Sequence, residues 1–174
     1  MMLTIRRATP SDIPMLGLIG PAAYAEAYGD WWETPAAYYA YLQGFGAAAF
    51  TTFFTLAEAR VWVAEVDGAP VGFLTMRLDT PDPVSGEAGG VAIPKIYMFG
   101  SARGAGVGRA LLEAAEAEAR AAGAAYLWLD SMQRAEWAWR AYERWGFVRI
   151  GEIMLDNGLK PDRTTLLVMK RRLR

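Results

Sequence analysis

A strand that runs through a glycine-rich turn directly into a long helix is the feature that most constrains how this chain can fold. Residues 91–98 predict a strand and residues 106–122 predict a helix that ends at Gly123. Between them the chain reads Phe-Gly-Ser-Ala-Arg-Gly-Ala. A strand joined to a helix by so tight a connection is a typical building unit of α/β domains, so we expect an α/β fold.

The rest of the chain supplies further strands and helices on both sides of this unit. Residues 44–56 fit either a helix or a packed loop. No repeat or linker divides the chain, so we predict one domain over residues 1–174, with a mixed sheet flanked by helices. The other expected elements are strands at 3–7, 60–66, 69–78, 126–130, 148–155 and 164–169, and helices from Ser11 or Asp12 to about Tyr28, from Thr34-Pro35, and over 135–144.

Two absences restrict the chemistry. The 174 residues contain no histidine and no cysteine, which excludes a Ser-His-Asp triad, a histidine base, a thiolate nucleophile and a zinc ribbon. We therefore expect no metal site, and we expect catalysis to use carboxylates, hydroxyls, backbone amides or the reactivity of a cofactor.

Charge and hydropathy indicate the kind of partner. The last five residues carry four of the 18 basic residues, so the preceding chain has 14 basic against 19 acidic residues. Residues 8–59 contain neither lysine nor arginine but hold half of the aromatic residues. Such a surface favours a cationic small molecule over nucleic acid. No apolar run reaches the ~20 residues that span a bilayer, so we expect a cytoplasmic protein with no membrane partner.

The glycine turn has the properties of a pyrophosphate site. Glycines allow the backbone to approach a ligand closely, and the free amides and dipole at a helix start favour an anion. Arg103 and Arg109 add positive charge beside the turn. A P-loop would need Gly-Lys-Ser/Thr, but here Arg109 and Ala110 follow Gly108. The glycine spacing also differs from the Rossmann fingerprint.

The turn resembles the Gln/Arg-x-x-Gly-x-Gly/Ala motif of the GNAT N-acetyltransferases. Further similarities are ordered along the chain as in that family. They are the opening Ile-Arg-Arg-Ala with Ser-Asp at 11–12, the hairpin Trp-Val-Ala-Glu-Val-Asp-Gly-Ala-Pro-Val-Gly-Phe at 62–73, and Ala-Tyr-Glu-Arg-Trp-Gly-Phe at 141–147. The resemblance implies a mostly antiparallel twisted sheet and acetyl-CoA as the acetyl donor.

The resemblance also assigns roles to residues. Ile96, Tyr97 and Met98 would pair their backbone with the pantetheine arm, and an amide near Met98 would polarise the thioester carbonyl. Tyr142 would act as the general acid toward the departing thiolate, since a phenol and a thiol have similar pKa values. The pyrophosphate would bind the turn formed by Arg103, Gly104, Ala105, Gly106, Val107, Gly108 and Arg109.

Two positions depart from the family pattern. The family often has an asparagine seven residues before the tyrosine, where this chain has Ala135, and Gln133 or Arg134 are the available substitutes. It also often has a glutamate base near the position of Ala92. Another group or ordered water must then deprotonate the amine, and the candidates are Glu26, Asp30 and Glu87.

The acceptor is predicted to be a primary amine. Glu26, Tyr28 and Asp30 lie in the segment that forms the acceptor wall in the family, and the absence of basic residues there fits a cation. Residues 28–30, 38–43, 150–152 and 166–170 are loosely similar to the bacterial spermidine/spermine N-acetyltransferase branch, which favours polyamines. The alternatives are a peptide or ribosomal-protein N-terminus, and a non-catalytic acyl-CoA sensor. Exposed strands and aromatics favour a homodimer.

Overall fold

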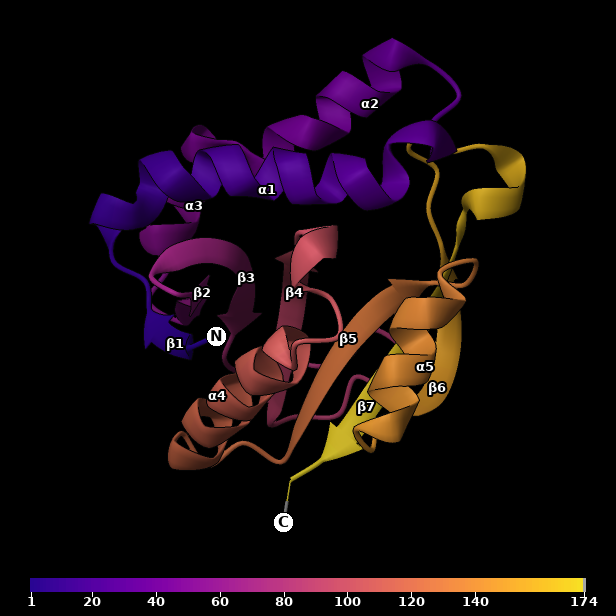
Figure 1. Ribbon diagram of the computed structural model, residues 1–174. Coiled ribbons are helices and arrows are strands. Elements are labelled where there is room, and N and C mark those ends of the chain that lie inside the picture. The colour runs from indigo at the N-terminus through magenta and orange to yellow at the C-terminus, as the bar shows by residue number, and fades with distance from the viewer. Residues whose placement is uncertain (174) are drawn as a thin grey trace.

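The computed structural model describes residues 1–173 and contains one seven-stranded sheet with the strand order β1-β2-β3-β4-β5-β7-β6 (Figure 1). All neighbouring strands are antiparallel except β4 and β5. The mostly antiparallel α/β fold is therefore confirmed. The strands are β1 (Leu3–Arg7), β2 (Ala59–Val66), β3 (Ala69–Arg77), β4 (Gly90–Met98), β5 (Tyr126–Met132), β6 (Val148–Met154) and β7 (Thr165–Arg172).

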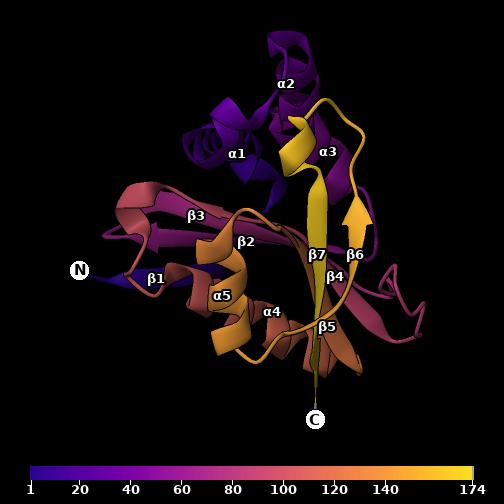
Figure 2. The ribbon, with the colours of Figure 1, turned by 90° about the vertical axis from the view of Figure 1, so that its right-hand side faces the viewer.

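Helices cover both faces of this sheet, as the two views show (Figures 1 and 2). Within residues 1–173, no helix is long and apolar enough to cross a membrane. The α-helices are α1 (Ile13–Tyr28), α2 (Pro35–Leu42), α3 (Ala47–Phe54), α4 (Val107–Ala121) and α5 (Glu136–Arg144).

The predicted helix starts are largely as observed, with one difference at α1. Thr34 caps α2, since its hydroxyl accepts a hydrogen bond from the Ala37 amide at 3.2 Å. Asp12 precedes α1, but its carboxylate binds the guanidinium of Arg6 at 2.8 and 3.0 Å instead of a helix amide. This ion pair ties β1 to the start of α1. The undecided segment 44–56 contains α3.

The core is divided by the sheet because strand side chains alternate between its faces. On one face, α1 and α3 enclose aromatic residues such as Tyr24, Phe45 and Phe73, all of which are buried. On the other face, α4 presents Leu111 and Ala115 to the strands. Most of the aromatic residues of the segment without lysine or arginine therefore belong to the core.

The pairing of β4 with β5 is short. It comprises three residue pairs, from Gly90 opposite Tyr126 to Ala92 opposite Trp128. Beyond Ala92 the two strands diverge, while β4 stays paired to β3 and β5 stays paired to β7 (Figure 1). This divergence leaves an opening between two strands in the middle of the sheet.

A buried ion network fastens the loop between β3 and β4 to β7. The ammonium of Lys170 contacts the carboxylates of Asp82 at 2.9 Å and Glu87 at 2.7 Å, and the side chains of Lys170 and Asp82 are 7% and 0% exposed. The more exposed Arg172 also binds Glu87. The predicted strand at 164–169 thus extends through the first residues of the basic C-terminal segment, whose last residue, Arg174, lies outside the described residues.

We predict that Lys170→Met destabilises the protein by about 3–5 kcal/mol, because it leaves the buried carboxylate of Asp82 without its counter-charge. Urea denaturation measures this loss. The matched control is Arg172→Met, which removes an exposed partner of Glu87 and should cost below about 1 kcal/mol. An equal loss in both variants would contradict the importance of the buried pair.

Candidate active site

The opening between β4 and β5 holds a cleft of about 470 Å³. It is bounded by β4, by the turn before α4, by α5 and by one side of α1. The predicted site residues that line this cleft are Tyr28, Ile96, Tyr97, Met98, Arg103, Gly104, Gly106, Val107, Gly108, Arg109 and Tyr142. The structure therefore brings together most of the predicted site; Ala105 lies inside the same turn but outside the lining, and Glu26 and Asp30 also lie outside it.

The glycine turn presents unpaired amides at the cleft. Gly104 and Gly106 both have φ of +80°, a conformation that disfavours residues with a Cβ atom. Gly106 is the N-cap of α4, and no side chain caps this helix start. The first amides of α4 are thus available to an anion, and the helix dipole adds to the attraction.

The backbone of β4 has a free edge in the cleft. The Phe99 amide donates to the Val71 carbonyl on the β3 side at 3.0 Å. Because strand amides alternate between the two edges, the Met98 amide points to the other side, where β5 has already diverged. An extended ligand bearing amide groups could pair with this edge as an added strand does.

Tyr142 lies where this cleft meets a second, smaller cavity. Its ring packs against Trp145 and Phe147, and burial raises the pKa of its hydroxyl above the ordinary value. The hydroxyl has no hydrogen-bond partner within residues 1–173. It therefore keeps its proton at physiological pH and is free to donate a hydrogen bond. The pKa of Tyr142 is thus further above that of a thiol than the sequence led us to expect.

The acidic residues proposed as bases do not line either cavity. The Glu26 carboxylate accepts the Gly100 amide at 2.9 Å, and so holds α1 to the glycine turn. Asp30 is exposed, and its backbone carbonyl accepts the Lys160 ammonium. Glu87 pairs with Arg172 and Lys170, whose hydrogen bonds lower its pKa to about 2 and make it a weak base. Of the three residues predicted to bind the acceptor, only Tyr28 lines the cleft.

At the two positions that depart from the family pattern, no residue next to them in the sequence takes over the expected role. Ala135 is fully buried at the start of α5. Arg134 pairs with Asp162, and neither it nor Gln133 lines the cleft. Ala92 is also buried, at the last residue pair between β4 and β5.

Sequence reasoning missed one acidic residue, Asp130 of β5. It lines the second cavity, of about 70 Å³, which adjoins the cleft through Tyr28, Ile96, Tyr97 and Tyr142. The residue is exposed to solvent, yet protein atoms surround most of its carboxylate. This burial raises its pKa to about 6, against the opposing charge of Lys95. The one feature that could have indicated Asp130 in the sequence is its place near the carboxyl end of the strand that runs parallel to β4.

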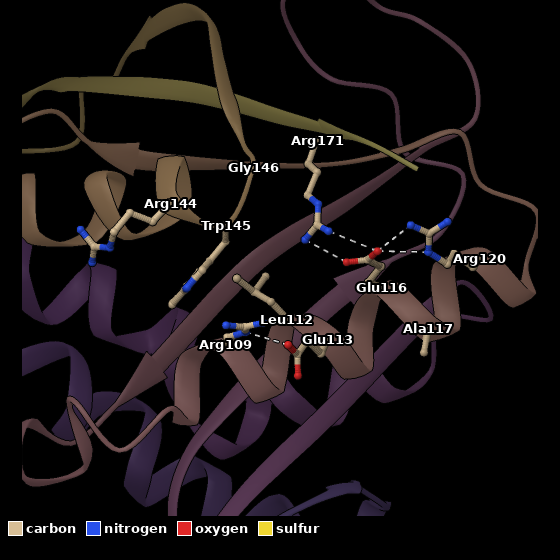
Figure 3. Close-up of a pocket in the computed structure, with 10 residues that line it drawn as sticks. All are labelled: Arg109, Leu112, Glu113, Glu116, Ala117, Arg120, Arg144, Trp145, Gly146 and Arg171. Atoms are coloured by element: carbon tan, nitrogen blue, oxygen red, sulfur yellow. Dashed lines mark hydrogen bonds and ion pairs between the residues drawn. The ribbon is translucent and has the colours of Figure 1, made fainter. Parts of the chain in front are cut away.

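A hollow rich in arginine adjoins the other end of the cleft and shares Arg109, Arg144 and Trp145 with it. Figure 3 shows that most of its charges are paired within the hollow. Arg109 binds Glu113 at 2.8 Å, and Arg171 binds Glu116 at 2.9 Å. Arg144 has no ionic partner within residues 1–173.

Comparisons with solved structures show that other proteins share this fold. The PaiA N-acetyltransferase of Thermoplasma acidophilum, solved with coenzyme A, is 13% identical with a TM-score of 0.78, and the alignment covers 99% of this chain and 100% of that one. The yncA putative acetyltransferase of Salmonella typhimurium, solved with acetyl-CoA, is 21% identical with a TM-score of 0.68, covering 99% and 94%.

A third structure has higher sequence identity. The ribosomal-protein-alanine N-acetyltransferase of Brucella melitensis is 26% identical with a TM-score of 0.71, covering 98% of this chain and 99% of that one. A comparison with curated protein sequences found no match. The sequence pattern of the acetyltransferase (GNAT) family matches residues 22–147, more than half of the chain. This chain belongs to the acetyltransferase (GNAT) family.

Proposed function

We propose that this protein transfers an acetyl group from acetyl-CoA directly to a primary amine. The observation that carries the proposal is the meeting of a long cleft and a small cavity at Tyr142. The cleft offers a free strand edge and an uncapped helix start, which suit the amides of pantetheine and a pyrophosphate. The cavity offers space for a second, smaller reactant at the end of that cleft.

The chain's own groups account for the steps of the reaction. The cleft holds the thioester beside the acceptor, which replaces a bimolecular encounter by a positioned one. The Met98 amide stabilises the negative charge that develops on the carbonyl oxygen. Tyr142 hydrogen-bonds to the sulfur as the thiolate departs, and its raised pKa keeps the donor proton in place. No covalent enzyme intermediate is needed.

We propose a small cationic amine, such as a polyamine, as the acceptor. The cavity is too small for a bulky group around the reacting nitrogen, and α1, α2 and α3 contribute neither lysine nor arginine to it. The second candidate is a peptide N-terminus, favoured by the 26% identity to a ribosomal-protein-alanine N-acetyltransferase. The loose similarity to the spermidine/spermine branch and the homodimer stay predictions, although exposed Val148 and Met154 on the edge strand β6 favour a dimer.

The proposed function predicts a preference among acceptors. Spermidine and unbranched monoamines should release CoA from acetyl-CoA at least about tenfold faster, in kcat/KM, than a peptide beginning with alanine, because a branched α-carbon fits the small cavity poorly. Steady-state assays of thiol release measure this. Preference for the peptide would support the N-terminal alternative, and no turnover with any amine would support the sensor.

Tyr142→Phe should lower kcat by about 100-fold, because it removes the hydrogen-bond donor to the thiolate while keeping the ring in place. Calorimetric CoA affinity should change less than about threefold. Tyr39→Phe is the matched control, since Tyr39 is 64% exposed on α2 and lies outside both cavities. Unchanged kcat in the Tyr142 variant would remove this residue from the mechanism.

Gly106→Ala should weaken CoA binding about tenfold by distorting the turn that presents the amides, a loss equivalent to about 1.4 kcal/mol. Gly123→Ala is a matched control, because Gly123 also has a positive φ (+74°) with open space around it, but at the far end of α4. Both variants should lose about 1–2 kcal/mol of stability from the left-handed backbone conformation. Equal CoA affinity in the two would contradict a pyrophosphate site at the turn.

A further inference from the structure

The cavity beside Tyr142 contains one carboxylate, and its surroundings are mainly aromatic. Asp130 contributes this group from β5, two residues beyond the last residue pair with β4. Tyr24 and Tyr28 approach from α1, Tyr41 from α2 and Tyr97 from β4. A carboxylate among aromatic faces is a suitable site for an organic ammonium group.

The position of Asp130 relative to the cleft is also specific. The cavity and the cleft share Tyr28, Ile96, Tyr97, Ala138 and Tyr142, so a group at the shared boundary can be reached from both sides. Asp130 lines the cavity and does not line the cleft. A donor in the cleft and an amine beside Asp130 would therefore approach the boundary from opposite directions.

We infer that the Asp130 carboxylate binds the ammonium group of the acceptor and takes the proton that must leave before the nitrogen can attack. This inference rests on the proposed acetyl transfer and identifies its base. It replaces Glu26, Asp30 and Glu87, none of which lines the cavity. Asp130 is exposed to solvent, which gives the accepted proton a route to water.

The proton and electron balance is complete without another reactant. The ammonium gives one proton to Asp130, and the neutral amine forms the N–C bond with the thioester carbonyl. The C–S bond then breaks with its electron pair on sulfur. The second nitrogen proton neutralises the thiolate, with Tyr142 hydrogen-bonded to the sulfur. The products are the acetylated amine and CoA thiol.

The charged and titratable groups around Asp130 are consistent with this role. Lys95 of β4 is the one cation that acts on it within residues 1–173, and burial lowers the pKa of Lys95 itself. The carboxylate in turn raises the pKa of the hydroxyls of Tyr41 and Tyr142, after burial as the main cause. These phenols and those of Tyr24, Tyr28 and Tyr97 stay neutral at physiological pH, since burial raises all their pKa values. Asp130 is thus the group that titrates near neutrality.

The test is the pH dependence of kcat/KM for wild type and Asp130→Asn, with spermidine as the acceptor and acetyl-CoA as the donor. Wild type should lose activity as the pH falls through about 6, because the carboxylate must be ionised to accept a proton. Above that pH its profile should be level until the amine deprotonates near about 10.

Asp130→Asn should reduce kcat/KM at least 100-fold at pH 7.5. Its activity should then rise continuously with pH up to about 10, because only the neutral fraction of the amine reacts. CoA affinity, measured by calorimetry, should stay within about threefold of wild type and shows that the variant is folded. Asp67→Asn is the matched control, since it removes an exposed carboxylate at the β2–β3 turn outside both cavities.

The outcomes separate this inference from the proposed function. Suppose that wild type acetylates amines, and that Asp130→Asn has the same kcat/KM as wild type and the same loss of activity at low pH. The role of Asp130 is then overturned and the acetyl transfer stands. If wild type acetylates neither spermidine nor the monoamines nor the alanine peptide although it binds CoA, both are overturned. A lower rate with an unchanged shape of the pH profile would also contradict proton transfer to Asp130.

Discussion

The early end of the pairing between β4 and β5 is the constraint on which the rest of the site depends. Three residue pairs hold these parallel strands together, and the sheet then opens although both strands remain paired on their outer sides. The free edge of β4 faces this opening, and the amides before α4 stand at one end of it. A continuous sheet would offer neither a cleft nor unpaired backbone groups in the middle of the fold.

Charge is distributed along the opening in a way that suits two different reactants. Arg103 and Arg109 stand at the glycine turn, whereas Asp130 stands at the other side of Tyr142. An anionic acetyl donor and a cationic amine are therefore attracted to opposite parts of the site. The chain has no histidine or cysteine for the reaction, and under our proposal backbone amides, one phenol and one carboxylate suffice.

The elements and most of the residues that line the cleft could be predicted from the sequence, because both depend on local patterns. Alternation located the strands, and the spacing of Gly104, Gly106 and Gly108 located the turn. The acceptor side that we propose depends on long-range pairing. Whether Asp130 faces a cavity follows from β5 lying next to β4, and whether Glu87 is free follows from its contact with Lys170. Neither fact is visible in a local segment of sequence.

The most direct test of the account is a crystal structure with a bisubstrate inhibitor that joins spermidine to CoA through an acetyl bridge. We expect the bridge carbonyl at the Met98 amide, the sulfur at the Tyr142 hydroxyl, and the bridged nitrogen within hydrogen-bond reach of the Asp130 carboxylate. An inhibitor that lies along β4 but directs its amine away from the cavity beside Tyr142 would contradict the central claim that the two reactants meet there.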